Sequence, residues 1–243
     1  MTDPITRSPD HPITRFPVLN AIVDVDVAER AGWTPLDLAS AYLNGGARFL
    51  QVRAKSLAGG AFLDLATRIV ELGRDAGAIV VVNDRADVAR LSHADGVHVG
   101  QEDLSPAAAR AIVGPGGVVG LSTHTEAQID AALDQPISYL AVGPIFGTST
   151  KATGYHAVGL ERVRYAARKV RLKPATTTAT YVASGCSRTL DVVAIGGITL
   201  DNIAGVIQAG AASAAVITDL LATGDPEARV RAYVERVRQG AKV

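Results

Sequence analysis

The feature that most constrains the fold is an alternation of short β-branched runs with longer Ala- and Leu-rich stretches. The short runs occupy residues 18–25, 47–53, 78–83, 96–100, 118–122, 139–145, 192–197 and 214–218. Repeated strand–helix units of this kind build parallel sheets whose strands are buried on both faces. Eight such units within 243 residues predict a (β/α)8 barrel, the TIM barrel, in a single α/β domain.

Helix start signals support the same alternation. A capping side chain precedes a proline at Thr34-Pro35, Ser105-Pro106 and Asp225-Pro226. The side-chain oxygen can accept a hydrogen bond from the first helical turn, and proline is tolerated at the first helical position. Each pair therefore predicts the start of a helix.

Two segments do not follow the repeat. Residues 1–16 carry prolines and acids, so we expect a mobile N-terminal extension, with the barrel spanning residues 17–243. Residues 171–190 have a Thr-rich centre without helical period, which predicts an inserted surface loop.

Composition excludes several classes of protein. Lys plus Arg and Asp plus Glu both number 24, so the formal net charge of zero gives no footprint of a nucleic-acid binder. No apolar run approaches membrane-spanning length. The only cysteine, Cys186, excludes an internal disulfide and a cysteine zinc cluster, and we expect a protein of the reducing cytoplasm. The sequence leaves a homo-oligomer open.

Carboxylates and cations follow several of the expected strands. In TIM barrels the active site lies at the carboxyl ends of the strands, so these residues should meet at one mouth. Asp84 and Asp103 each follow an apolar run and suit Mg²⁺, which takes oxygen ligands and often one or two carboxylates. Arg53, Lys55 and Lys151 suit the oxygens of a diphosphate.

A second phosphate site is indicated at Gly196-Gly197, since glycines let backbone N–H groups approach an anion. Loops after the seventh and eighth strands of such barrels often bind phosphate. Thr148 and Thr150 would lie nearby, which suggests a second ligand carrying one phosphate.

Each of these signals has an ordinary structural alternative. A single Asp after a strand is commonly a helix cap, two glycines can form a tight turn, and residues 148–151 can be a polar loop. We expect His98 to be a packed core residue and His93 to cap a helix end. For His124, a helix-start role and a substrate contact stay equally open.

Six motifs in order resemble the thiamine phosphate synthase family over about residues 18–222. They are QVRAKS (51–56), VNDRADVA (82–89), ADGVHVGQEDL (94–104), GLSTHT (120–125), GPIFGTSTK (143–151) and AIGGITLDN (194–202). The resemblance implies a transferase that joins 4-amino-2-methyl-5-hydroxymethylpyrimidine diphosphate to a thiazole phosphate or its carboxylated form. Thiamine phosphate and pyrophosphate would be the products, with Mg²⁺ as cofactor and small molecules as the expected partners.

The resemblance also implies roles for individual residues. Asp84 and Asp103 match the family's Mg²⁺ ligands. The residues that match its pyrimidine diphosphate contacts are Gln51, Arg53, Lys55, Asn83, Ser122 and Lys151, and of these Arg53, Lys55, Ser122 and Lys151 are expected to be catalytic. The residues that match its thiazole phosphate contacts are Thr148, Thr150, Gly197, Ile217 and Thr218.

Three features depart from the family pattern. Ala54 replaces a frequent Glu, whose side chain would alternate away from the site. Thr218 replaces the usual Ser, and residues 171–190 lengthen a segment that is short in most members. Two rival functions remain, a thiazole tautomerase-like relative and a module that binds thiazole phosphate without catalysis. Neither needs the carboxylates and cations of the diphosphate side.

Overall fold

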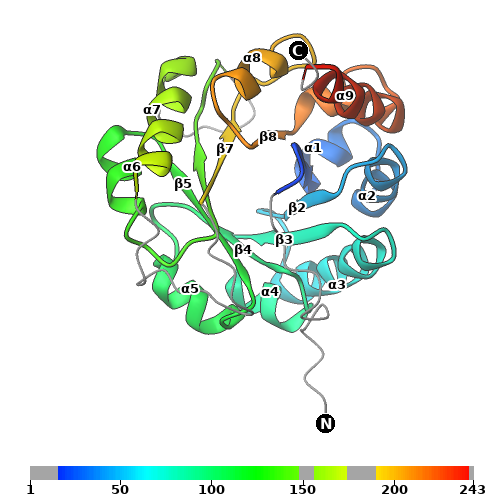
Figure 1. The fold of residues 1–243 in the computed structure, drawn as a ribbon. Helices are drawn as coiled ribbons and strands as arrows, with labels where there is room; N and C mark the ends of the chain where they lie inside the picture. The colour runs from blue at the N-terminus through cyan, green and yellow to red at the C-terminus, as the bar shows by residue number, and fades with distance from the viewer. Residues whose placement is uncertain (1–15, 148–155, 174–189, 241–243) are drawn as a thin grey trace.

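Parallel strands close into a barrel in the order β1 to β8, with β8 paired to β1, and helices ring the outside (Figure 1). The computed structural model describes residues 16–147, 156–173 and 190–240. The strands are β1 (Leu19–Asp24), β2 (Phe49–Arg53), β3 (Ile79–Asn83), β4 (Gly96–Val99), β5 (Val118–Thr123), β6 (Tyr139–Val142), β7 (Asp191–Ile195) and β8 (Ser213–Val216). The predicted (β/α)8 barrel is confirmed.

Helices follow the strands along the chain. They are α1 (Val25–Arg30), α2 (Pro35–Asn44), α3 (Gly59–Asp75), α4 (Ala86–Leu91), α5 (Pro106–Val113), α6 (Glu126–Ala132), α7 (Gly159–Leu172), α8 (Ile203–Gln208), the 3₁₀ turn η2 (Thr218–Leu221) and α9 (Pro226–Gly240). The three predicted caps are confirmed. The backbone N–H groups of Asp37, Ala108 and Ala228 donate to the side chains of Thr34, Ser105 and Asp225 at 3.1, 3.2 and 2.9 Å.

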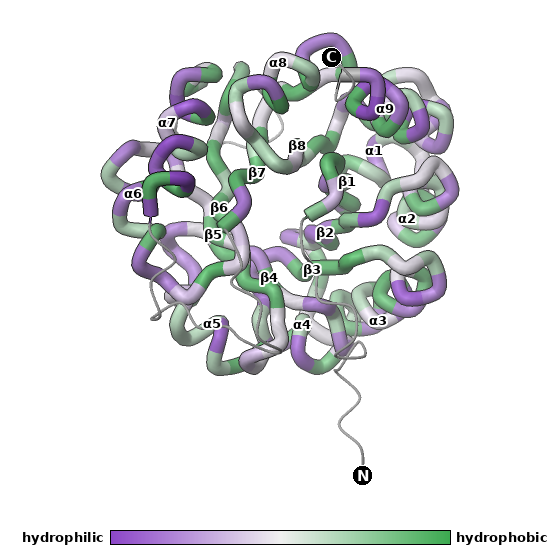
Figure 2. Tube along the Cα trace, viewed as in Figure 1, coloured by the Kyte–Doolittle hydropathy of each residue, from purple (hydrophilic) through white to green (hydrophobic). Residues whose placement is uncertain are grey.

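The strands bury side chains on both faces, and their hydrophobic character stands out in Figure 2. Alternate residues point outward to the helices, as Val23 and Val52 do, or inward to the barrel centre, as Ile22 and Phe49 do. Along β2 this alternation puts every second residue inside, up to Arg53 at the strand's carboxyl end. Inward positions at the strand ends therefore supply the mouth of the barrel.

Aromatic rings fill the opposite end of the barrel, where the strands begin. The ring of Phe16 lies 5.0 Å from that of Phe49 and 5.1 Å from that of Tyr139, between centroids. Phe16 is only 2% exposed, and its N–H donates to the Asp191 carboxylate at 3.2 Å. The expectation that Phe16 belongs to a mobile extension is therefore wrong, because this apolar ring closes the core. Residues 1–15 lie outside the described residues.

Helix α7 runs to Leu172, so the first two residues assigned to the inserted loop are helical. The Lys173 ammonium then contacts Asp134 at 3.1 Å, which fixes the chain just after the helix. Leu190 packs against the core before β7. The rest of the predicted insertion, residues 174–189, lies outside the described residues.

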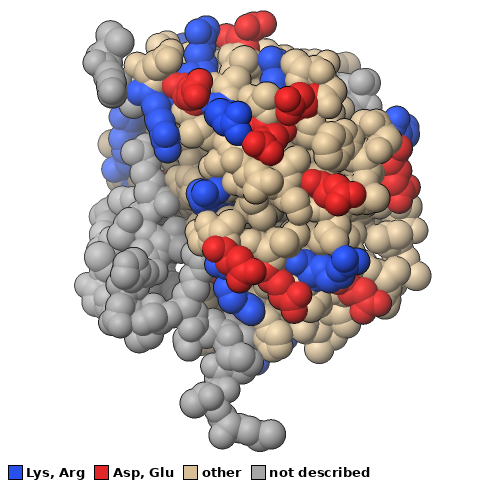
Figure 3. All heavy atoms as spheres, turned by 90° about the vertical axis from the view of Figure 1, so that its right-hand side faces the viewer, with Lys and Arg blue, Asp and Glu red and all other residues tan. Residues whose placement is uncertain are grey.

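The surface carries a mixture of charges on the face drawn in Figure 3. Basic and acidic side chains alternate there rather than gathering by sign. This agrees with equal numbers of positive and negative residues in the sequence. Among the described residues, no helix combines the length and the apolar character that crossing a membrane requires.

Candidate active site

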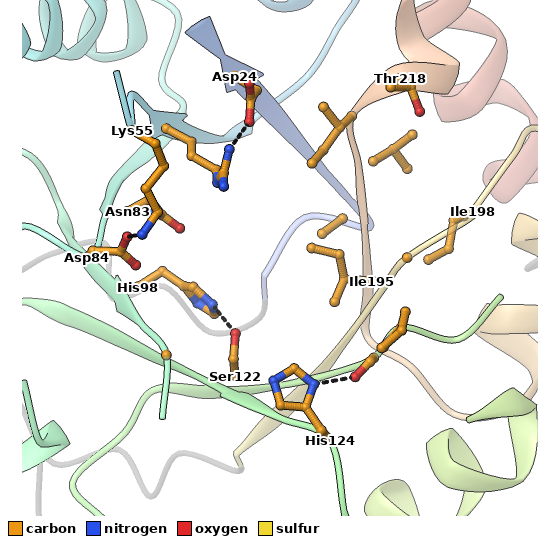
Figure 4. A pocket seen from close by; sticks show the side chains of 18 of the residues that line it. Asp24, Lys55, Asn83, Asp84, His98, Ser122, His124, Ile195, Ile198 and Thr218 are labelled. Atoms are coloured by element: carbon orange, nitrogen blue, oxygen red, sulfur yellow. Dashed lines mark hydrogen bonds and ion pairs between the residues drawn. The ribbon is translucent and has the colours of Figure 1, made fainter. Parts of the chain in front are cut away.

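A cavity of about 590 Å³ opens at the carboxyl ends of the strands (Figure 4). Every strand or the loop after it contributes to its wall, as TIM-barrel geometry requires. Of the residues that the sequence analysis placed at this mouth, it is lined by Arg53, Lys55, Asn83, Asp84, Asp103, Ser122, His124, Gly196, Gly197, Ile217 and Thr218. Residues from separate parts of the chain thus share one cavity.

Asp84 has an unusual backbone and an unusual carboxyl group. Its φ is 63°, a left-handed conformation that Asp tolerates better than most residues, and its N–H donates to the His98 carbonyl at 2.7 Å. Burial raises the pKa of the Asp84 carboxyl, and the neighbouring Asp103 carboxylate raises it further, while the ion pair with Lys55 opposes both effects. The ionised form of Asp84 therefore needs more positive charge than Lys55 provides.

Asp103 is held close to Asp84 by its own loop. Its Oδ2 accepts a hydrogen bond from the Gly100 N–H at 2.8 Å. A Cβ at Gly100 would lie 3.0 Å from that oxygen, so glycine allows the close turn. No group of three or more His, Cys, Asp or Glu suited to a metal occurs within the described ranges. Two carboxylates match Mg²⁺ better than zinc, since Mg²⁺ usually completes its shell with water and substrate phosphate.

The Arg53 guanidinium is anchored by Asp24, its register partner on the neighbouring strand β1, which the sequence analysis missed. The two side chains form an ion pair at the edge of the cavity, with Asp24 only 2% exposed (Figure 4). The other oxygen of Asp24 accepts from the Val27 N–H at 3.1 Å and caps α1. Asp24 ends an apolar strand just as Asp84 follows one, so the same signal could have found it.

Ser122 and His98 form a polar pair on neighbouring strands. The Ser122 Oγ lies 2.8 Å from the His98 Nε2, and both residues line the cavity. His98 is 6% exposed, so the prediction that it is packed in the core is confirmed. Its contact with a site residue was missed, since only the pairing of β4 with β5 brings the two side chains together.

Gln51 lies one inward position before Arg53, below the residues that line the cavity. It is 2% exposed, and its Oε1 has no hydrogen-bond partner among the described residues. A buried acceptor without a donor is costly, so a ligand donor reaching this depth would be favoured. Ala54 is buried in the outer core, which confirms that position 54 alternates away from the site.

The loop after β7 offers backbone donors to the cavity. Gly196 and Gly197 have φ values of 99° and 62°, which favour glycine. The N–H groups of Gly197 and Ile198 donate to no acceptor in the described part of the chain. A Cβ at Gly197 would lie 2.6 Å from the Gly147 carbonyl oxygen and 2.8 Å from the Phe146 Cβ. Packing against the loop after β6 therefore requires glycine here, in addition to any need for space around an anion.

Asp219, also missed from the sequence, joins the loops after β7 and β8. Its Oδ2 accepts from the Leu200 N–H at 3.2 Å, from Arg229 Nη2 at 2.7 Å and from the Tyr233 hydroxyl at 2.5 Å. Arg229 and Tyr233 belong to α9, and Asp219 follows Thr218 directly. The carboxylate thus holds both predicted phosphate loops against one helix.

The helix-start role of His124 is confirmed, whereas its contact with substrate stays a prediction. Its backbone N–H donates to the Gln128 side chain at 2.7 Å at the start of α6, and its ring lines the cavity. The ring Nδ1 lies 2.6 Å from the Gly143 carbonyl oxygen, so Nδ1 carries a proton. His93 follows α4 with φ 56° and does not line the cavity. Thr148, Thr150 and Lys151 lie outside the described residues.

Comparison with known proteins gives consistent results. The family described as thiamine monophosphate synthase matches residues 20–220. A thiamine-phosphate synthase of Roseiflexus sp. (strain RS-1) is 38% identical over 234 residues, 96% of this chain and 91% of that protein. A thiamine-phosphate synthase of Anaeromyxobacter dehalogenans (strain 2CP-C) is 41% identical over 215 residues, 86% of this chain and 88% of that protein.

Solved structures agree with the sequence matches. Thiamine phosphate pyrophosphorylase from Pyrococcus furiosus superposes with a TM-score of 0.77 at 26% identity, over 92% of this chain and 96% of that one. The resemblance inferred from the six motifs is confirmed.

Proposed function

Because this chain belongs to the thiamine monophosphate synthase family, we propose that its cavity performs the family's transferase reaction. The substrates are 4-amino-2-methyl-5-hydroxymethylpyrimidine diphosphate and 4-methyl-5-(2-phosphooxyethyl)thiazole or its carboxylated form. The products are thiamine phosphate and pyrophosphate, and the carboxylated thiazole also releases CO2. One observation carries the proposal: the cavity has carboxylates and cations on one wall and the glycine loop after β7 on another (Figure 4).

With the uncarboxylated thiazole the reaction balances without an external proton donor. The carboxylated form also loses its carboxyl group as CO2, and the ring carbon left behind takes up a proton. The bond between the pyrimidine methylene carbon and the diphosphate oxygen breaks, and its electron pair leaves with pyrophosphate. The electron-rich aminopyrimidine stabilises the resulting cation, and the thiazole nitrogen supplies the pair for the new carbon–nitrogen bond. Positioning and charge stabilisation on the leaving group then provide most of the catalysis.

Two kinds of cationic side chain serve the pyrimidine diphosphate. Arg53, oriented by Asp24, presents planar donors to phosphate oxygens, and Lys55 adds a point charge beside Asp84. The remaining residues assigned to this substrate are Gln51, Asn83, Ser122 and Lys151, with Arg53, Lys55, Ser122 and Lys151 in the catalytic set. Each stabilises charge or orients the pyrimidine ring.

Mg²⁺ fits the carboxylate pair by its chemistry. Asp84 and Asp103 supply hard oxygen donors, and the raised pKa of Asp84 indicates a site short of positive charge. We assign both residues as the ligands. When bound there, Mg²⁺ would neutralise part of the diphosphate charge.

The thiazole phosphate occupies the other wall. Backbone N–H groups of Gly197 and Ile198 are donors without acceptors in the described part of the chain, which suits an anion. The residues assigned to this substrate are Thr148, Thr150, Gly197, Ile217 and Thr218. We place the reaction in the cytoplasm. A chain with a single cysteine has no internal disulfide that reducing conditions could break.

Product analysis separates this function from its rivals. Both substrates are mixed with the protein and Mg²⁺, and thiamine phosphate and pyrophosphate are measured in equal amounts; a chelator should stop their formation. A tautomerase-like protein would change the thiazole without consuming diphosphate. A sensing module would bind thiazole phosphate and release no pyrophosphate, and either result would reject the proposed reaction.

A further inference from the structure

We propose that His98 is a positioning residue, fixed by Tyr139 in the tautomer that makes Ser122 donate its own hydroxyl proton into the cavity. The catalytic part of this inference rests on the proposed function, whereas the tautomer itself does not. The three residues lie on β4, β6 and β5, so neighbouring strands of the barrel build the arrangement.

The contacts form a continuous chain of hydrogen bonds. The Tyr139 hydroxyl lies 2.8 Å from the His98 Nδ1, and the His98 Nε2 lies 2.8 Å from the Ser122 Oγ. The tyrosine and imidazole rings stack with centroids 5.5 Å apart at an interplanar angle of 16°. Tyr139 is fully buried, whereas Ser122 is partly exposed to the cavity. The chain thus runs from the barrel interior to the site.

The direction of these bonds follows from the tyrosine. Burial raises the pKa of the Tyr139 hydroxyl, so it keeps its proton. Among the described residues the hydroxyl has one hydrogen-bond partner, the His98 Nδ1, and a buried hydroxyl proton without an acceptor costs stability. We therefore assign Nδ1 as the unprotonated nitrogen. A doubly protonated ring would direct an N–H at the hydroxyl and leave the tyrosine proton without its acceptor.

The consequence reaches Ser122 through the other ring nitrogen. A neutral imidazole with a bare Nδ1 carries its proton on Nε2, which donates to the Ser122 Oγ. The serine hydroxyl then accepts from His98 and keeps its own proton free to donate elsewhere. Since Ser122 lines the cavity, the structure presents a hydrogen-bond donor there, suited to the lone pair of a pyrimidine ring nitrogen.

Gly120 shows that β5 is adapted to this arrangement. A Cβ at position 120 would overlap the Tyr139 ring and hydroxyl and would lie 2.6 Å from the His98 Nδ1. Glycine in a strand interior is otherwise unfavourable, and close approach of another group is a usual reason for it. The missing side chain provides the space in which tyrosine and histidine meet.

The tautomer can be measured directly in the wild-type protein without substrates. Nitrogen-15 NMR correlations from the imidazole carbon-bound protons identify which ring nitrogen is protonated, and His98→Gln assigns the His98 signals. We expect a proton on Nε2 only at neutral pH. In Tyr139→Phe the ring should gain a population protonated on Nδ1. A wild-type ring protonated on Nδ1, or on both nitrogens, overturns the inference whatever the protein's activity.

Kinetics then test the effect on Ser122. Tyr139→Phe should lower kcat/KM for the pyrimidine diphosphate about tenfold, the size expected for one hydrogen bond, and leave KM for the thiazole phosphate unchanged. The matched control is Tyr42→Phe, because the buried Tyr42 hydroxyl has no hydrogen-bond partner among the described residues and lies in the outer core. It should retain wild-type kinetics.

Conservative replacement separates positioning from packing. The side-chain amide of His98→Gln can still donate to Ser122, so this variant should keep more activity toward the pyrimidine diphosphate than His98→Leu. Circular dichroism confirms that each variant is folded. Equal losses for Gln and Leu, or a Tyr139→Phe variant that loses both substrates equally, would show that the residues only pack.

Discussion

At the scale of single residues, Asp84 has two features that cost stability. It adopts a left-handed backbone, and its carboxyl has a raised pKa beside Asp103. Strained residues and perturbed carboxyl groups gather at functional sites, where the surrounding structure enforces them. Asp84 is therefore expected to reduce stability in exchange for binding a cation.

Asp84→Asn should unfold at a higher temperature than the wild type at pH 7 without divalent cations. A raised folded-state pKa means that folding favours the protonated carboxyl, so ionisation above that pKa destabilises the protein. Below the ordinary Asp value, about 3.9, both states are protonated and the difference should vanish. Thermal melts across this pH range test it.

Added Mg²⁺ should reverse the order by stabilising only the wild type, and turnover should be lost in the variant. Asp87→Asn is the control, because its exposed ion pair with Arg85 lowers the pKa of Asp87, and removing that charge should not raise the melting temperature. A melting temperature of Asp84→Asn below that of the wild type at pH 7 without Mg²⁺ would contradict the assignment.

Asp24→Asn should lower kcat by about 10- to 100-fold and change KM for the thiazole phosphate little. The asparagine can still cap α1, but it no longer holds the Arg53 guanidinium by charge. Arg53 is assigned to charge that develops as pyrophosphate leaves, and losing one such donor costs about 10²- to 10³-fold. Steady-state kinetics of both substrates provide the measurement.

The control for Asp24→Asn is Asp37→Asn. Asp37 lies on α2, and its exposed carboxylate accepts a hydrogen bond from the Thr34 hydroxyl. That variant should behave as the wild type. If Asp24→Asn keeps full kcat in a folded protein, Arg53 does not need the anchor.

At the scale of elements, the site depends on how α9 holds the loops after β7 and β8. Asp219 accepts hydrogen bonds from the β7 loop and from two side chains of α9. The N–H groups of Gly197 and Ile198 can point at one anion only while this loop is fixed. Element packing thus determines the geometry of the backbone donors.

Asp219→Ala should weaken binding of thiazole phosphate about tenfold and leave affinity for the pyrimidine diphosphate nearly unchanged. The loss follows from releasing the Leu200 N–H and the loop that carries Gly197. Isothermal titration calorimetry with each ligand measures both effects. Tyr233→Phe removes one donor from Asp219 but keeps the bond to Leu200, so it should bind nearly as the wild type. Equal weakening of both ligands in Asp219→Ala would indicate general loosening of the barrel.

At the scale of the whole molecule, the barrel is closed at one end by aromatic rings and open at the other for the site. Phe16 precedes β1 and packs against Phe49 and Tyr139, the same tyrosine that contacts His98. The rings at the closed end are therefore in direct contact with the hydrogen-bonded residues Tyr139, His98 and Ser122. Substitutions that disturb the rings at the closed end should therefore also alter the site, because Tyr139 belongs to both.

Phe16→Ala should lower the free energy of unfolding by about 3–5 kcal/mol, the usual range for a buried phenylalanine. Phe16→Leu should cost less, because it leaves a smaller cavity. Denaturant unfolding followed by fluorescence or circular dichroism compares the two. A loss under about 1 kcal/mol for alanine would show that Phe16 contributes little to the core.

The order of strands and helices could be predicted from the sequence because each element depends on local patterns. Runs of β-branched residues and capping pairs such as Ser105-Pro106 act over a few residues, and the repeat alone predicts a closed parallel barrel. The same rule brings polar residues after the strands to one mouth. Arg53, Asp84 and Gly197 were therefore predicted to share one mouth, and all three line the cavity.

Only the tertiary structure decided which side chains touch. The Tyr139 hydroxyl and His98 are 41 residues apart, and their bond depends on the register of β4, β5 and β6 and on the space at Gly120. The anchoring of Arg53 by Asp24 and the burial of Phe16 likewise depend on barrel closure. Such contacts have no local signal, because a hydrogen bond or a ring packing requires a position in space that distant segments create together.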